Sequence, residues 1–475
     1  MEKIDMILES PQTAFKGNFD EHAQRPINYR VLGTLGIVAI TYLFSSGGPI
    51  GSEPIMSSGG SLIALISLVV YPLFMTIPYA YIVAELCSAF PEDGGFTIWV
   101  LNAFGPFWAF QVGYWSWIAG VIRIAVAPAT ILRLLLHYYG HGEHLSASQP
   151  LEYCVRIGIA LLLGVPALFG SLPVSRYTLL LVTVTIVTFL TYSVWAFTTA
   201  KTFDHLFEVR RRDDVFDPNT NDVTKSGSVD IQWDLLINTL FSKFDGIYMA
   251  SVFGGEVLNP SRTYPRAIFF TVLLIVATYI IPLPASLLAD GLSWLQFELD
   301  SFPTMALDIG GKILSTVVLV GSLCAAAGQF TSGIFIKSFM LSGMASNRLL
   351  PLSLSKRSVR YEAPTYGIGL TTVVAALMAC IQSDDLVHLS NAFAAIVQFV
   401  IIVAAMRLRM TLPYIPRPTK VPGGVVGLMV FAAMPAVVLG YILLQVFLNL
   451  LAASLLFAGF LIAGIAYGFW SVRWT

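Results

Sequence analysis

Charged side chains inside long apolar stretches are the first candidates for chemistry in this sequence. Arg123 lies midway through one such stretch, Glu256 follows a Gly-Gly pair in a second, and Glu85 lies near the end of a third. An ionisable group inside a bilayer costs several kcal/mol unless it is paired or hydrated. Each of these three residues is therefore a candidate functional residue.

The roles of these residues can be narrowed by their chemistry. The guanidinium of Arg123 could bind a substrate carboxylate through two parallel hydrogen bonds, or it could pair with an acid in the membrane such as Glu85 or Glu256. Glu256 could accept a substrate amine, stabilise its loop through backbone N–H groups, or carry a coupling proton. Glu85 could instead organise a network with the loop that follows its stretch.

Four further side chains near Glu256 could act at a gate. Lys243 and Asp245 are two residues apart and could pair with each other across an outer gate, or simply extend towards the membrane surface. Tyr248 and Phe253 are aromatic and could close over a substrate, although most aromatic residues in a membrane protein only pack or face lipid.

The composition identifies the environment of these residues. Hydrophobic residues make up 56% of the 475 residues and charged residues 12%, whereas soluble domains carry roughly 25% charged residues. Apolar blocks such as 61–84 and 177–200 carry no charge, and about 20 apolar residues suffice for one transmembrane helix. We therefore predict an all-α integral membrane protein.

Short polar segments divide the chain into twelve predicted spans. They cover approximately 31–57, 61–90, 104–138, 152–170, 175–200, 234–258, 265–289, 312–346, 365–381, 386–407, 424–447 and 449–471. Lysines and arginines concentrate in alternate connections, which places both termini in the cytosol. The predicted parts are a cytosolic tail (1–30), a ten-helix core (31–410, with halves 31–200 and 234–410) and two final helices with a short cytosolic end (411–475).

Two spans are interrupted by glycine and proline at corresponding places in the two halves. A regular helix cannot pass through Gly47, Gly48, Pro49 and Gly51, and the sixth span contains Gly254-Gly255 and Pro260. Paired interruptions of this kind indicate a transporter's substrate site near the middle of the membrane, although small residues can also serve helix packing. The predicted substrate-binding residues are Ser46, Gly47, Gly48, Gly51, Arg123, Val252, Phe253 and Gly254.

The interrupted segments carry a resemblance to a known family. The run 46–53 (Ser-Gly-Gly-Pro-Ile-Gly-Ser-Glu), the run 91–95 (Pro-Glu-Asp-Gly-Gly) and the run 104–108 (Phe-Gly-Pro-Phe-Trp) resemble the amino acid–polyamine–organocation superfamily. The likeness is greatest to its plant and protozoan polyamine and L-type amino acid branch, and it extends over roughly residues 30–410. It implies five-plus-five inverted repeats with broken helices 1 and 6, and transport of amino acids or polyamines, usually coupled to protons.

One residue departs from the polyamine carriers that this chain resembles. Those carriers tend to place an acidic residue where this chain has Arg123, and a fixed positive charge would repel a polyamine. The hypothesis is therefore a proton-coupled amino acid permease of the plasma membrane, in which Glu256 carries the proton or meets the amine, and Glu85, Asp245 and Tyr248 act as a gate or network. A polyamine carrier and a non-transporting receptor or assembly subunit are the alternatives.

The expected partners are a small substrate and the lipid bilayer. No P-loop, zinc-ligand spacing or nucleophile motif occurs, so we predict no enzymatic activity, no catalytic residue, no bound metal or cofactor and no nucleic-acid partner. Hydroxyls in the eighth span can hold sodium in the fold that the resemblance implies, so sodium coupling stays open beside proton coupling. The oligomeric state is open as well.

Overall fold

The computed structural model describes residues 30–139, 149–200, 203–212, 215–216, 223–225, 227–288, 293–381, 384–449 and 451–472. The predicted cytosolic tail lies almost wholly outside this part. Most of the described residues are helical. In the first half the helices are α1 (Thr34–Ser45), α2 (Pro54–Gly59), α3 (Ser61–Tyr71), η3 (Pro72–Thr76), α4 (Ile77–Ala89), α5 (Phe96–Phe104), α6 (Pro106–Tyr139), α8 (Gln149–Gly164), η4 (Val165–Phe169) and α9 (Ser171–Thr199).

The second half continues the pattern. Its elements are α10 (Trp233–Phe244), η6 (Ile247–Val252), η7 (Gly254–Glu256), α11 (Pro260–Ile280), α12 (Pro282–Ser286), η8 (Trp294–Gln296), α13 (Phe302–Ser346), η9 (Leu352–Ser355), α14 (Thr365–Met378), α15 (Asp384–Thr411), α16 (Gly424–Asn449) and α17 (Leu451–Val472). Within the described residues, eight helical runs are long and apolar enough to cross a bilayer, and three shorter apolar helices accompany them. An integral membrane protein built of helices is thereby confirmed.

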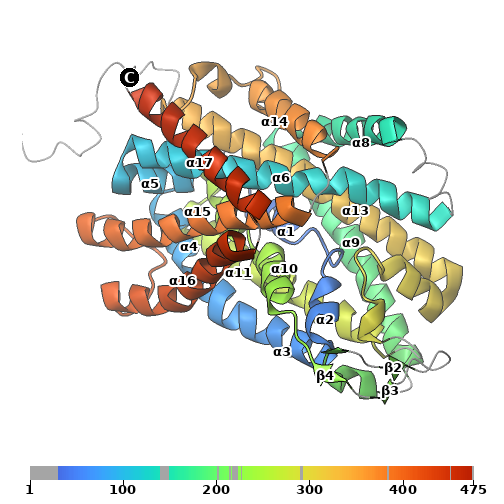
Figure 1. The fold of residues 1–475 in the computed structure, drawn as a ribbon. Helices are drawn as coiled ribbons and strands as arrows, with labels where there is room; N and C mark the ends of the chain where they lie inside the picture. Colours follow the sequence, from blue (N-terminus) through green and yellow to red (C-terminus); the bar gives the residue numbers. More distant parts are fainter. Residues whose placement is uncertain are drawn as a thin grey trace, which may run out of the picture.

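The two longest helices form the centre of the molecule. In Figure 1, α6 and α13 run through its body, with α8 and α14 on one side and α3 on the other. The helix α6 has 34 residues and α13 has 45, but α13 is kinked at Gly310 and Gly311. The helix α13 packs against α9, α6 and α1, and α15 packs against α6 and α16.

The chain leaves the α-helical conformation in both places that the glycines and prolines predicted, and the second place holds only the short 3-10 helices η6 and η7. The first break covers residues 46–53, between α1 and α2, and the second break covers residues 245–259, between α10 and α11. Gly47, Gly48 and Gly51 have φ angles of 63°, 78° and 75°. Residues that carry a Cβ rarely adopt such values. The backbone conformation of the first break therefore requires glycine at these three positions.

The connection between α9 and α10 contains the structure's short strands. There β1 (Arg211–Arg212) pairs with β4 (Ser228–Val229), and β2 (Val215–Phe216) pairs with β3 (Val223–Lys225). This connection is joined to α2, because Arg210 Nη1 donates to the carbonyl of Ser57 at 2.6 Å and the Arg210 N–H donates to the carbonyl of Gly59.

Candidate functional site

The first break packs against α13 at its glycines. A Cβ on Gly47 would lie 2.8 Å from the amide of Gln329, and a Cβ on Gly48 would lie 2.9 Å from the Cβ of Ala325. A larger residue at position 47 would displace the side chain of Gln329, and one at position 48 would press on α13 at Ala325. Ser46, the predicted site residue before the glycines, is fully buried.

A tyrosine that the sequence analysis missed joins the first break to the end of α10, directly before the second break. The hydroxyl of Tyr279 lies 2.8 Å from Ser46 Oγ and 3.3 Å from the carbonyl oxygen of Ser46. It also lies 3.2 Å from the carbonyl oxygen of Lys243, at the end of α10. Tyr279 therefore contacts polar groups that regular helices would have satisfied. Its position in α11 gives no sequence signal for this role.

The second break meets the end of α1 at Gly246. This residue has φ 105°, and a Cβ on it would lie 2.8 Å from Ser45 Oγ and about as close to the ring of Phe44. The predicted contact residues Val252, Phe253 and Gly254 have other neighbours. Phe253 stacks on Phe335 of α13 with ring centroids 5.4 Å apart, and Gly254 lies against the backbone of Glu92.

Arg123 forms a buried ion pair with Asp245 at the start of the second break. Its Nη2 lies 2.7 Å from Asp245 Oδ2, and both side chains are less than a tenth exposed. The Nη2 atom is too poorly aligned for a good hydrogen bond, and Nη1 donates to the backbone carbonyl of Asp245 at 3.4 Å. The guanidinium also lies over the ring of Phe44, 5.9 Å from its centroid. Arg123 therefore lies beside α1, where that helix ends.

This geometry corrects two expected pairings. Within the described residues Arg123 pairs with Asp245 and not with Glu85 or Glu256, because the latter two acids bind other arginines. Lys243 does not pair with Asp245 either. Its Nζ donates to the carbonyl oxygen of Ile50 in the first break, at 2.7 Å. Lys243 and Asp245 point to different partners because the helix α10 ends between them, at Phe244.

Lys337 is a second functional candidate that the sequence analysis missed. It lies in α13 and is completely buried. Its Nζ donates to the carbonyl oxygen of Ser116 at 2.7 Å and lies 3.0 Å from the Ser116 hydroxyl. It also lies 5.3 Å from the centroid of the Phe44 ring. The rule that drew attention to Arg123, a charge within an apolar span, applies equally to Lys337.

Glu256 is held by groups from two other parts of the chain. Arg357 Nη1 donates to its Oε1 at 2.7 Å, and the Ser171 hydroxyl donates to its Oε2 at 3.0 Å. Arg357 Nη2 also donates to Asp93 at 3.2 Å, and Asp93 accepts from the N–H of Gly255. We call Asp93, Ser171, Glu256 and Arg357 the latch. It joins the second break to the start of α9 and to the connections before α5 and α14.

Glu85 takes part in a separate network. Its carboxylate pairs with Arg409 at the end of α15, lies 3.2 Å from Arg417 Nε, and accepts from the N–H of Val421 at 2.8 Å. The expected network with the loop after its own helix is replaced by one with the connection between α15 and α16. Tyr248 is buried and packs edge-on against Phe96, with ring centroids 5.1 Å apart.

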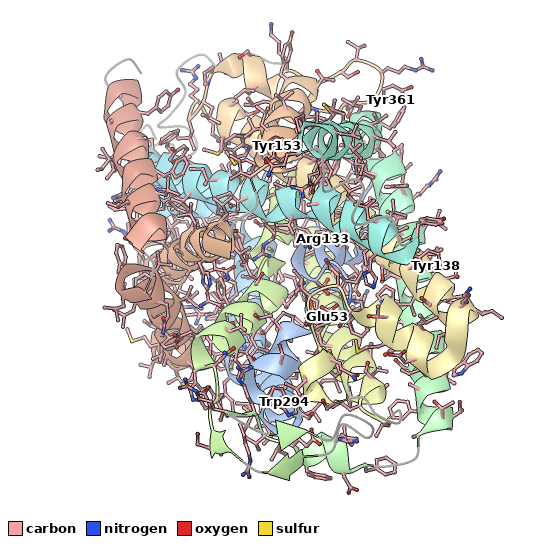
Figure 2. All side chains as sticks on the ribbon, turned by 45° about the vertical axis from the view of Figure 1, so that its right-hand side comes forward. Glu53, Arg133, Tyr138, Tyr153, Trp294 and Tyr361 are labelled. Atoms are coloured by element: carbon pink, nitrogen blue, oxygen red, sulfur yellow. The ribbon has the colours of Figure 1, made fainter. Side chains whose placement is uncertain are left out.

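Glu53 ends the first break and is another residue that the sequence analysis did not select. In Figure 2 it lies in the interior, between the labelled Arg133 and Trp294. Its side chain is completely buried, and its carboxylate oxygens have no hydrogen-bond partner within the described chain. Asp300, an acid in its electrostatic range, binds Arg133 at 2.7 Å.

Comparison with known proteins gives a consistent result along the chain. Residues 32–467 match the family described as amino acid permease. The polyamine transporter RMV1 of Arabidopsis thaliana is 31% identical over 432 residues, which are 90% of this chain and 83% of the relative. The polyamine transporter PUT1 of Oryza sativa subsp. japonica is 29% identical over 449 residues, or 93% of this chain and 80% of the relative.

A bacterial relative carries a different substrate name. The serine/threonine exchanger SteT of Bacillus subtilis (strain 168) is 24% identical over 342 residues, which are 69% of this chain and 70% of the relative. The matches confirm the resemblance drawn from the glycine-rich runs. They also show that the protein is a membrane transporter and not an enzyme.

Proposed function

Because the chain belongs to the amino acid permease family, we propose that it carries amino acids across the plasma membrane by alternating access, driven by a proton gradient. The fold we propose for this activity has twelve spans, inverted five-helix repeats and both termini in the cytosol. Tyr279 links the first break to the end of α10, and Gly246 of the second break packs against the end of α1, which supports a substrate site between the two breaks.

The observation that favours amino acids is the charge around the breaks. Three basic side chains, Arg123, Lys243 and Lys337, lie at or near them. Lys337 is completely buried and the Arg123 side chain is 8% exposed, and the acids Asp245 and Glu53 are buried beside them. A polyamine with several positive charges would be repelled there, because like charges interact strongly where water is excluded. A substrate carboxylate would be attracted.

The proposed binding mode assigns one substrate group to each break. The carboxylate meets the unwound backbone of the first break, from Ser46 to Gly51, together with Arg123. The ammonium group meets backbone carbonyls of the second break, for which Val252, Phe253 and Gly254 are the predicted positions. Broken helices suit this division, since their backbone groups are free to bind opposite charges.

The names of the relatives support a second candidate, polyamine transport. In that case Asp245, Glu85 and Glu256 would contribute to recognition of a polycation. The exchange Arg123→Asp separates the two candidates. It should abolish amino acid uptake under the first proposal, and it should leave or improve polyamine uptake under the second.

Uptake by the purified protein in proteoliposomes tests the proposal. Labelled amino acids and putrescine are offered with and without an imposed pH gradient, and with and without sodium. Saturable, gradient-driven amino acid uptake is expected. Strong putrescine uptake without amino acid uptake would overturn it. Substrate binding without any flux would point instead to a receptor or assembly subunit.

A further inference from the structure

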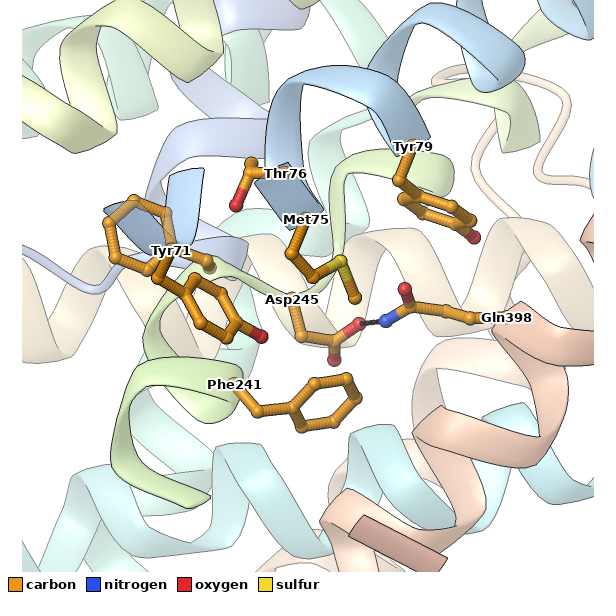
Figure 3. A pocket seen from close by; sticks show the side chains of 8 residues that line it. Tyr71, Met75, Thr76, Tyr79, Phe241, Asp245 and Gln398 are labelled. Carbon is orange, nitrogen blue, oxygen red and sulfur yellow. Dashed lines mark hydrogen bonds between the residues drawn. The ribbon is translucent and has the colours of Figure 1, made fainter. Parts of the chain in front are cut away.

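A small pocket lies beside the ion pair of Arg123 and Asp245. Figure 3 shows the carboxylate of Asp245 among aromatic and polar side chains from α3, η3, α4, α10 and α15. The lining residues are Tyr71, Met75, Thr76, Tyr79, Phe241, Phe244, Asp245 and Gln398. The pocket has room for about one water molecule. None of the predicted substrate-binding residues lines it.

Four buried polar atoms of the lining lack a hydrogen-bond partner within the described chain. They are the hydroxyl oxygens of Tyr71, Thr76 and Tyr79 and the amide oxygen of Gln398. A buried polar group without a partner costs about 1 to 3 kcal/mol, and four in one pocket are unusual. Water, which both donates and accepts, is the guest that suits three hydroxyls and an amide oxygen.

The backbone around the pocket is also irregular. Between α3 and α4 the chain forms the π-helical turn Pro72–Thr76. Such turns inside helices often occur at functional sites. The turn supplies Met75 and Thr76 to the pocket wall, and Tyr71 and Tyr79 flank it on either side. Tyr71 also packs against Phe244, with ring centroids 5.6 Å apart.

Asp245 is the carboxylate among the groups gathered at this pocket. Its Oδ2 faces Arg123 of α6, and its Oδ1 accepts from Gln398 Nε2 of α15 at 2.6 Å. The titratable or charged groups within its electrostatic range are Arg123 of α6, Lys337 of α13, Tyr71 of α3, Tyr79 of α4 and Tyr248 of η6. Lys337 is held by Ser116. Arg123 is therefore the cation that directly balances the charge of Asp245.

We infer that Asp245 takes up the coupling proton, through water in this pocket, whenever a substrate carboxylate draws Arg123 away from it. The inference rests on the proposed function. When the substrate binds Arg123, Asp245 would be left as an unpaired buried carboxylate, which is strongly unfavourable. A proton from the aqueous solution on the side of substrate entry, relayed by the pocket water, binds Oδ2 and neutralises the carboxylate. When the substrate leaves, Arg123 returns and the proton passes back to water on the other side of the membrane.

This exchange keeps constant the negative charge that faces Arg123. One substrate carboxylate enters with one proton. The carboxylate takes the place of Asp245 beside Arg123, and the proton neutralises Asp245. Glu256 is less suited to the task that the sequence suggested for it. Its two carboxylate oxygens already accept from Arg357 and Ser171, and binding of a substrate to Arg123 would remove neither of these partners.

The test compares net uptake with exchange in proteoliposomes, using the neutral amino acid that gives the largest wild-type uptake. Net uptake driven by a pH gradient needs the proton step, whereas exchange of internal for external substrate does not. In Asp245→Asn we expect gradient-driven accumulation to fall at least about tenfold relative to exchange, and the substrate-linked pH change inside the vesicles to disappear. Asp234→Asn, the same chemical change at an exposed position of α10, the helix that precedes Asp245, should keep both.

A second variant covers the possibility that Asp245→Asn does not fold. The double change of Tyr71→Phe with Tyr79→Phe removes two of the partnerless hydroxyls and keeps the ring packing. It should lower gradient-driven accumulation relative to exchange and shift its pH profile. If every folded variant kept the wild-type ratio of gradient-driven accumulation to exchange, the inference would be overturned and the proposed function would stay intact. An absence of amino acid transport in the wild-type protein would overturn the proposed function itself.

Discussion

Arg357 reaches Glu256 from the connection before α14, with its Nη1 atom 2.7 Å from Oε1 of the acid. Both side chains are largely buried, with exposed fractions of 13% and 4%. The contact closes one end of the second break against the start of α9, where Ser171 binds the same carboxylate. An ion pair in this position is suited to hold one conformation of the transport cycle closed.

The first prediction concerns the strength of this latch. Glu256→Gln and Arg357→Gln should each lower the thermal stability of the purified protein. The first leaves Arg357 with Asp93 alone, and the second leaves the buried carboxylate of Glu256 without its arginine. The double variant should lose less than the sum, with a coupling of about 1 to 3 kcal/mol. Thermal unfolding of the four proteins in detergent measures this, and strictly additive losses would contradict it.

A second prediction concerns Arg123. Arg123→Ala should reduce amino acid uptake at least about 30-fold, because truncating one member of a buried charge pair costs about 2 to 5 kcal/mol. The reversed pair, Arg123→Asp with Asp245→Arg, should recover thermal stability but not uptake. Recovery of uptake by the reversed pair would mean that Arg123 acts only through Asp245 and has no contact with substrate.

The third prediction concerns Tyr279, whose hydroxyl links the first break to the end of α10. Tyr279→Phe removes the hydroxyl that contacts Ser46 and the carbonyl of Lys243. We expect a loss of about 1 kcal/mol for each hydrogen bond removed, seen as a lower unfolding temperature, together with a higher KM for transport. Tyr138→Phe is the matched control, since its hydroxyl contacts Thr316 at an exposed position. An unchanged KM in Tyr279→Phe would show that the contacts of this hydroxyl have no role in substrate binding.

A fourth prediction separates backbone strain from close packing. Gly246 and Gly105 both have positive φ angles, 105° and 89°. A Cβ on Gly246 would meet Ser45 and Phe44, whereas a Cβ on Gly105 would meet nothing within 4 Å. Gly105→Ala should therefore cost only the strain of its backbone, about 1 to 2 kcal/mol. Gly246→Ala should cost more and reduce transport. Equal losses in the two variants would show that the breaks tolerate displacement at Gly246.

Local features of the fold were predictable from the sequence because they depend on local composition. The apolar blocks show a membrane protein of helices, and Gly47, Gly48 and Gly51 interrupt α1 where their φ angles require glycine. The length of the second break was harder to predict. It begins at Asp245, where α10 ends before Gly246, and not at the Gly-Gly pair that drew attention to it.

The partners of the buried charges could not be predicted in the same way. Arg123 and Asp245 are 122 residues apart, and only the packing of α6 against the end of α10 brings them together. Glu85 shows the same limit, since its arginines come from the far end of the chain. Lys337 was predictable from its apolar surroundings, although its binding to Ser116 was not. The predicted substrate contacts still await the transport measurements.

The connection of strands between α9 and α10 has a mechanical consequence. Arg210 binds the carbonyl oxygens of Ser57 and Gly59 at the end of α2. The helix α2 is the part of the first broken helix that follows the glycines. If α2 tilts while the substrate site opens, this connection is pulled along with it. A fluorophore on the strands would then report the motion of a buried helix from a point that can be labelled without touching the transport path.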